Sequence, residues 1–312
     1  MTLPVAVGLV LLGLGLLAGG GEALVRGAVA IARHAGVTPA VIGLTVVAVG
    51  TSLPELVVSV LASLQGQSDL AVGNVVGSNI LNLTGILGTA ALAAALPVHR
   101  AAIRLEWPMV VFASALTLLL ASDGLIDGTD AAVMLGTITA FTWWMVGHAR
   151  REFAADTTIH LPTGIGVGAA VVLVAIGVVL LVVGARLLVS GAVSLARLAG
   201  WSERVIGLTI VAIGTSTPEL ATSIIAARRG RTDMAISNLL GSNTFNLLGI
   251  LGAAGVLHPV PVSAGLLRSD MVWMLLTAGL LLPLLATGQR VSRREGGLLV
   301  AVYLAYIILL LR

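Results

Sequence analysis

The 312-residue chain contains no cysteine, and only 10% of its residues are charged. Without cysteine there can be no disulfide, no thiolate chemistry and no cysteine-based metal site. A soluble domain carries about 25% charged residues, so the low charge argues against a soluble fold. Lysine is missing as well, and all seventeen basic residues are arginine. The absences together favour a protein made for lipid.

Apolar residues take the place of the missing charge. They form 58% of the chain, and the mean hydropathy is +1.08. Since a spanning helix needs about 20 apolar residues, the length allows about ten spans and no sizeable soluble domain. The net charge of +3 is better explained by arginine in cytoplasmic loops than by nucleic-acid binding. The N-terminus lacks the features of a cleaved signal peptide, so we expect a retained first span.

One internal repeat organises the chain. Residues 41–88 align without gaps on 205–252 at a constant offset of 164, with about 28 of the 48 positions identical. The offset also relates charged residues outside this block, such as Glu106 and Asp270. The unit was therefore duplicated, with a first repeat at 1–148, a short cytoplasmic linker at 149–162 and a second repeat at 163–312.

Apolar runs between charges and turn residues predict an all-α integral membrane protein with about ten spans. The expected spans are 3–33, 38–64, 69–96, 104–121, 127–148, 163–198, 203–228, 233–257, 267–287 and 296–311. Five spans per repeat is an odd number, so the two repeats must enter the membrane in opposite orientations. With both termini outside, twelve of the seventeen arginines lie on the cytoplasmic side, as the positive-inside rule requires.

Two glutamates lie near the middle of apolar spans. They are Glu55 and Glu219, which are equivalent under the offset of 164. A charge at the bilayer centre costs about 2.5–3.5 kcal/mol on the insertion scale and usually marks an ion or substrate pathway. The alternative is a polar clamp between helices, or glutamates buried in protonated form. Because the cost is borne twice at symmetric positions, we favour an ion pathway.

Proline precedes each glutamate in the repeated motif Gly-Thr-Ser-x-Pro-Glu. Pro54 and Pro218 cannot donate to the carbonyl four residues back, which frees the carbonyls of Gly50 and Gly214. Free carbonyls, two hydroxyls and a carboxylate within one turn form a set of hard oxygen ligands. An ordinary proline kink, with serine and threonine as filler, is the alternative.

A polar stripe follows on the next span of each repeat. Its members recur every fourth residue, which predicts one helix face: Asn74, Ser78 and Asn82 in the first repeat, and Asn238, Ser242 and Asn246 in the second. The stripe either bonds neighbouring helices or completes an oxygen cage. Calcium takes 6–8 oxygen ligands, whereas zinc and copper prefer imidazole or thiolate. The histidines lie near span ends, so alkali and alkaline-earth cations are favoured.

These motifs resemble the alpha repeats of the cation/calcium exchanger superfamily, closest to its prokaryotic sodium/calcium exchangers. The resemblance implies that Glu55 and Glu219 bind calcium with the carbonyls of Thr51 and Thr215. It also implies sodium sites around the same glutamates, formed by Ala48, Ser52, Ser78, Asn82, Ala212, Ser216, Ser242 and Asn246. Some relatives have aspartate at one of the two stripe ends, whereas both are asparagine here. The departure leaves the number of sodium ions per calcium open and argues against potassium co-transport.

The function predicted from these features is sodium/calcium exchange by alternating access at one midplane site. Proton/calcium exchange on the same fold is the nearest alternative. A channel would need filter segments around an axis along the membrane normal, and no zinc-protease motif or membrane-depth catalytic base indicates an enzyme. We expect a multi-pass protein of the prokaryotic plasma membrane. Beyond lipid and the transported Na⁺ and Ca²⁺, no cofactor, nucleic acid or obligate protein partner is predicted.

Overall fold

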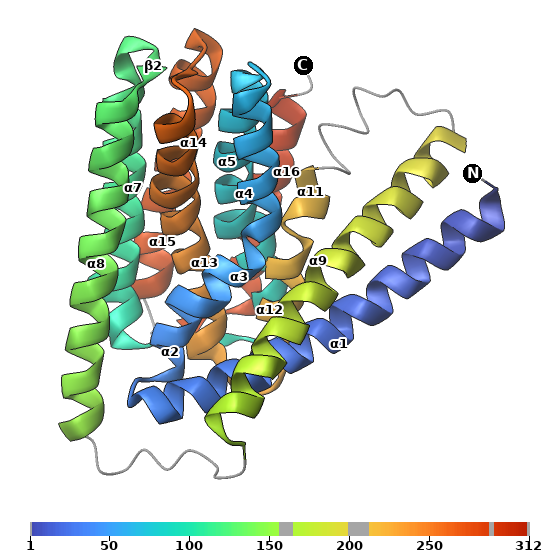
Figure 1. Ribbon diagram of the computed structural model, residues 1–312, viewed down its shortest axis with the longest axis vertical. Coiled ribbons are helices and arrows are strands. Elements are labelled where there is room, and N and C mark those ends of the chain that lie inside the picture. Colours follow the sequence, from blue (N-terminus) through green and yellow to red (C-terminus); the bar gives the residue numbers. More distant parts are fainter. Residues whose placement is uncertain (1, 156–164, 199–211, 287–289, 311–312) are drawn as a thin grey trace.

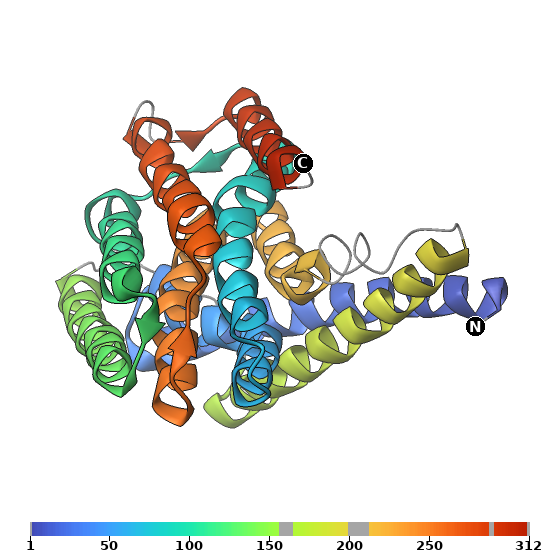
Figure 2. The same cartoon turned by 90° about the horizontal axis from the view of Figure 1, so that it is seen from above.

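The computed structural model describes residues 2–155, 165–198, 212–286 and 290–310. Two long helices, α1 (Leu3–Ala35) and α9 (Val167–Leu198), lie side by side and cross the rest of the molecule at a tilt (Figure 1). The other helices form an upright bundle, and α1 and α9 extend beyond it on one side (Figure 2). Most side chains of α1 and α9 are not buried, and Leu11, Leu12 and Leu14 are exposed, as lipid contact requires.

Glycine at every seventh residue brings α1 and α9 together. Gly13, Gly20 and Gly27 on α1 repeat as Gly177, Gly184 and Gly191 on α9, at the same offset of 164. A Cβ added at Gly20 would lie 2.9 Å from Leu180 Cβ and from Leu181 N, and one at Gly177 would lie 2.6 Å from Leu24 N. The backbones therefore touch along a glycine seam, the mode of close helix contact in membranes.

The first repeat continues through a broken helix and a buried one. Its elements are α2 (Pro39–Ile42), the π-helix η1 (Gly43–Val47), α3 (Ala48–Thr51), α4 (Leu53–Leu64), α5 (Ser68–Ile80), the π-helix η2 (Leu81–Ile86), α6 (Leu87–Ala93), the π-helix η3 (Ala102–Glu106), α7 (Trp107–Leu120), the 3-10 turn η4 (Ala121–Asp123) and α8 (Gly128–Ala155).

The second repeat is described from its broken helix onward. Its elements are α11 (Ala212–Thr215), α12 (Thr217–Arg228), α13 (Thr232–Thr244), the π-helix η6 (Phe245–Ile250), α14 (Leu251–Leu257), the π-helix η7 (Leu266–Asp270), α15 (Met271–Ala286) and α16 (Arg293–Leu310). The π-helices η6 and η7 repeat η2 and η3 at the offset of 164, so the duplication preserves irregular backbone as well as sequence.

Proline sets the break between α3 and α4. The segment Pro39–Thr51 and helix α4 meet at an angle of 48°, with Ser52 between them at φ −82°, ψ 10°. Pro54 lies in the first turn of α4, where its missing N–H leaves no helical bond unmade. Ser216 has the same conformation, φ −87°, ψ 8°, ahead of Pro218 in α12. In each repeat a single serine, Ser52 or Ser216, thus separates the two helical segments two residues before the proline.

Two short antiparallel ladders join loops of the two repeats, a feature that the all-α expectation did not include. β1 (Leu96–Pro97) pairs with β4 (Arg290–Val291) at one end of the bundle. β2 (Leu125–Ile126) pairs with β3 (Val260–Pro261) at the other. Each ladder links one repeat to the other, so the repeats are tied at both ends.

The helix ends differ from the expected spans at a few places. Helix α8, which is the fifth expected span, continues to Ala155 instead of ending at 148. Helix α9, the sixth expected span, starts at Val167 rather than 163. The start of the seventh span and residues 156–162 of the linker lie outside the described residues. Among the described residues, six helices are long and apolar enough to cross a membrane, and the bent pair at Pro39–Leu64 makes a seventh. The remaining spans, the inverted orientation and the placement of both termini outside stay predictions.

The glycine seam yields a first test. Gly20→Ala places a methyl group against the α9 backbone, and overpacking of this kind costs about 1–3 kcal/mol. Gly19→Ala is the matched control, since no described atom lies within 4 Å of its added Cβ and alanine favours a helix by about 1 kcal/mol. We expect thermal unfolding in detergent to shift down for Gly20→Ala and not for Gly19→Ala. Equal melting curves would mean that the helices do not touch along this seam.

Candidate ion-binding site

Glu55 and Glu219 are the centre of the candidate site. Both side chains are fully buried. Each lies in the first turn of its helix, α4 or α12, directly after the break. The positive end of a helix dipole favours a negative charge there. The structure thus places both glutamates at equivalent helix starts, each facing away from lipid.

Serine hydroxyls cross between the repeats to reach these carboxylates. Ser52 Oγ of the first repeat donates to Glu219 Oε1 of the second at 2.7 Å. Ser216 Oγ donates to Glu55 Oε1 at 2.9 Å. Since each glutamate is bonded by a serine from the other repeat, the two broken helices form one site rather than two.

Several oxygens at this site have no hydrogen-bond donor among the described residues. They are Oε2 of both glutamates and Oδ1 of Asn246, and Asn82 has neither its oxygen nor its nitrogen paired. A buried acceptor without a partner costs about 1–3 kcal/mol. These oxygens are directed inside the bundle, where a cation would satisfy them. The donor set therefore fits a hard cation.

The polar stripe braces the broken helices. Asn74 Nδ2 donates to Ser59 Oγ at 3.0 Å and to the carbonyl of Glu55 at 3.4 Å. Asn238 Nδ2 donates to Ser223 Oγ at 3.2 Å, which repeats the first of these bonds in the second half. Both asparagines therefore hold α4 and α12 in place.

The middle members of the stripe contact the breaks themselves. The Oγ atoms of Ser78 and Ser216 lie 3.2 Å apart, within hydrogen-bond distance, and Ser242 donates to the carbonyl of Ala48 at 3.5 Å. Thr51 is fully buried, and its hydroxyl donates to the same carbonyl of Ala48 at 3.3 Å.

Thr215 reaches the stripe directly, because its hydroxyl donates to Asn74 Oδ1 at 3.5 Å. Ala212 is the first residue of α11, next to the part of the chain that is not described. Contacts at the two breaks are therefore made by Ala48, Thr51, Ser52, Ser78, Thr215, Ser216 and Ser242.

Asn79 and Asn243 belong to the site region and were missed by the stripe pattern. Asn79 Nδ2 donates to the carbonyl of Asn243 at 3.2 Å, and Asn243 Nδ2 donates to the carbonyl of Asn79 at 3.1 Å. Asn246 also donates to Asn79 Oδ1, at 3.2 Å. Their signal in the sequence is identity at the offset of 164, one residue beside the stripe.

The expectation of one straight face is corrected by the π-helices. Asn82 lies in η2 and Asn246 in η6, where the backbone bonds run from i to i+5. The stripe therefore does not run along one uninterrupted α-helix, because its last member in each repeat lies in a π-helix.

The chemistry of the donors separates two classes of metal. Within the described residues there is no group of three or more His, Cys, Asp or Glu side chains that could hold a metal ion. The site offers two carboxylates and a larger number of neutral hydroxyl, amide and carbonyl oxygens. Such a set suits calcium or an alkali cation rather than a transition metal.

Comparison with known proteins agrees with this chemistry. The model of the family described as sodium/calcium exchanger protein matches residues 5–147 and 169–312. The chain belongs to the sodium/calcium exchanger family. The putative antiporter CaxA of Alkalimonas amylolytica is 38% identical, with 97% of each chain covered. The sodium/calcium exchanger MaX1 of Methanosarcina acetivorans is 30% identical, again with 97% of each chain covered.

A solved structure of the sodium-calcium exchanger NCX_Mj, soaked with zero Na⁺ and Ca²⁺, has the same fold. Its TM-score is 0.85 at 32% identity, and the match covers 99% of this chain and 100% of that one. The exchanger-family chain is accordingly a helical membrane protein and a cation/calcium exchange transporter. This assignment agrees with the family and the transport class that the sequence predicts. The relatives of the chain are exchangers rather than enzymes.

Calcium binding tests the two glutamates. Glu55→Gln or Glu219→Gln leaves Ca²⁺ with one carboxylate instead of two, and removing one partner of a buried pair of opposite charges costs about 3–5 kcal/mol. Calcium affinity should therefore fall more than about a hundredfold. Equilibrium binding of radioactive calcium to the purified protein measures this.

The matched control is Glu295→Gln. Glu295 is a glutamate of α16 that caps its own helix by accepting from the Ser292 amide at 2.7 Å, so its loss should leave calcium binding intact. If both site variants bind calcium with wild-type affinity and keep their melting temperatures, the two glutamates are not calcium ligands.

Proposed function

We propose that this exchanger-family chain exchanges Na⁺ for Ca²⁺ by alternating access at the site of Glu55 and Glu219. The observation that carries the proposal is the pair of buried carboxylates, each bonded by a serine of the opposite repeat and each with a second oxygen left unpaired. Two negative charges balance one Ca²⁺, and the neutral oxygens around them complete its coordination.

The two ions use overlapping ligands. In our proposal the calcium ligands are the two glutamates with the carbonyls of Thr51 and Thr215. The sodium ligands are the same glutamates with the hydroxyl, amide and carbonyl oxygens of Ala48, Ser52, Ser78, Asn82, Ala212, Ser216, Ser242 and Asn246. Both cargoes therefore compete for one pair of carboxylates.

Competition for buried carboxylates explains obligatory exchange. Two anions without a cation in a low-dielectric interior are strongly destabilised. A carrier in that condition would face a high barrier to reorientation, whereas a carrier loaded with sodium or calcium would not. Transport then proceeds only when one ion replaces the other.

Alternating access requires a moving part, for which α1 and α9 are suited. They are joined to each other through the glycine seam and lie obliquely across the bundle (Figure 1). Gly50 and Gly214 leave room beside the site for α9, because a Cβ added at either would clash with Val178 or Val189. We propose that α1 and α9 slide as one unit past the broken helices and so expose the site to one side at a time.

The path from the outer side is a cavity of about 530 Å³, and its lining includes Asp69, Asn74, Asp270 and Tyr306. Asn74 bonds the backbone of Glu55, so the cavity reaches a neighbour of the site. Acidic groups in a cleft raise the local cation concentration. The cavity faces outside when both termini are outside, and the prokaryotic plasma membrane is the proposed location.

Transport in liposomes tests the coupling ion. We expect calcium uptake under an outward sodium gradient and none under an outward proton gradient. Ser52→Ala should slow uptake about tenfold or more, because a hydrogen bond to a charged group is worth about 1.5–3 kcal/mol. Ser114→Ala is the matched control, a buried hydroxyl on α7 bonded only to its own helix at Val110.

The other outcomes assign the protein differently. Uptake driven by protons alone would transfer it to proton/calcium exchange at the same glutamates. Calcium movement without any counter-ion gradient would indicate a channel.

A further inference from the structure

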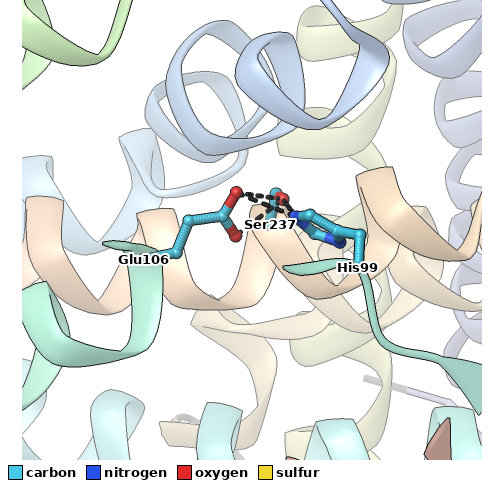
Figure 3. A network of polar contacts seen from close by, with 3 residues as sticks. All are labelled: His99, Glu106 and Ser237. Carbon is cyan, nitrogen blue, oxygen red and sulfur yellow. Dashed lines mark hydrogen bonds and ion pairs between the residues drawn. The ribbon is translucent and has the colours of Figure 1, made fainter. Parts of the chain in front are cut away.

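A third buried carboxylate lies apart from the ion site, at the end of the bundle that is cytoplasmic in the proposed orientation. Glu106 is 1% exposed at the end of η3. Ser237 on α13 donates to both of its oxygens, at 2.9 and 2.8 Å. His99 Nε2, from the preceding loop, lies 3.0 Å from Glu106 Oε1. Figure 3 shows the three side chains converging; we call them the polar clamp.

The clamp connects two repeats. His99 and Glu106 belong to the first repeat, and Ser237 belongs to α13 of the second. Ser237 is five residues before Ser242, which is about 7.5 Å along a helix. The clamp therefore holds the same helix that reaches the ion site through the bond of Ser242 to the Ala48 carbonyl.

The equivalent positions at the opposite end carry no such clamp. Under the offset of 164, His99, Glu106 and Ser237 correspond to Ser263, Asp270 and Gly73. Gly73 has no side chain to donate, and Asp270 instead accepts a bond from Tyr306 at 3.0 Å. Ser263, Asp270 and Gly73 line the open cavity of about 530 Å³. The clamp is therefore not a requirement of the fold, because the duplicated unit exists without it.

We propose that Glu106 is a positioning residue for α13 and that protonation of His99 controls how firmly it holds. Exchange then responds to pH on the clamp side of the membrane. This inference rests on the proposed exchange function. With His99 protonated, the clamp is a charged pair whose carboxylate also accepts the Ser237 hydroxyl, and this end of the bundle stays closed. With His99 neutral, the attraction to Glu106 weakens and α13 can move.

The electrostatic surroundings favour the charged form of His99. Burial lowers the pKa of His99, but the hydrogen bond and charge of Glu106, with the charge of Asp233, outweigh it, so the pKa is raised above its usual value. A raised pKa means that the clamp is fully charged below the ordinary value of about 6.5 and is lost as the pH rises through the raised value.

Other charged or titratable groups surround the clamp. A cavity of about 590 Å³ opens beside it, and β1 next to His99 pairs with β4. The groups on these elements are Asp233 on α13, Arg100 and Arg104 before and within η3, His148 on α8, and Arg290 on β4. Of these, His148 is the other histidine, which makes it the natural control.

The test is sodium-driven calcium uptake in liposomes with the pH varied on one side at a time. The chain has no cysteine, so one introduced cysteine and an impermeant label define which side faces out. For the wild type we expect uptake to rise several-fold between about pH 6 and pH 9 on the clamp side. His99→Ser, which installs the residue of the other repeat, should be fast and independent of pH there. His148→Ser should keep the wild-type profile.

A reciprocal variant tests the geometry by gain of function. Gly73→Ser with Ser263→His builds the clamp residues at the opposite end, where no described atom lies within 4 Å of a Cβ added at Gly73. We expect it to add pH dependence on the opposite side. A His99→Ser profile identical to wild type, or loss of the dependence in His148→Ser, would overturn the proposal.

A readout without transport separates this inference from the proposed function. If the wild type exchanges no calcium at any pH, the exchange proposal fails. The pH dependence of thermal stability then tests whether the clamp forms. The wild type should lose stability as the pH rises through the pKa of His99, and His99→Ser should not. If stability changes with pH in the same way in both proteins, His99 and Glu106 do not form a stabilising clamp.

Discussion

Two carboxylates buried in one low-dielectric interior are the constraint on which this structure depends. An isolated ionised group there costs several kcal/mol even after relaxation, so everything around Glu55 and Glu219 serves to make the pair tolerable. The helix breaks put each carboxylate at a positive helix end. The crossed serine hydroxyls satisfy one oxygen of each. The second oxygen of each carboxylate remains unpaired, and in our proposal a cation takes its place among these oxygens.

Much of this site could be predicted from the sequence, because an ionisable residue within an apolar span is energetically costly and therefore easy to recognise. Glu55 and Glu219 stand alone in apolar spans, and Pro54 and Pro218 predict the helix breaks from stereochemistry alone. The offset of 164 then assigns each residue its counterpart. The roles of the individual ligands remain proposals.

Other features followed from packing that no local pattern reveals. Asn82 and Asn246 lie in the π-helices η2 and η6, which a four-residue spacing cannot anticipate. The cross-repeat pair of Asn79 and Asn243 depends on the approach of α5 and α13. The glycine seam is visible as a seven-residue period, but its partner helix is known only from the fold. The clamp at Glu106 joins residues 131 apart in sequence.

The crossed bonds between Ser52 and Glu219, and between Ser216 and Glu55, have a consequence for how such a protein could arise. Neither repeat supplies the break serine that bonds its own glutamate, so a single repeat would lack this bond. In the inverted arrangement that we propose, an ancestral single repeat would have met its partner only by entering the membrane in both orientations. Fusion would have made this meeting certain and freed each half to diverge. The serine and glycine at positions 237 and 73, which face opposite ends of the bundle, are an example of that divergence.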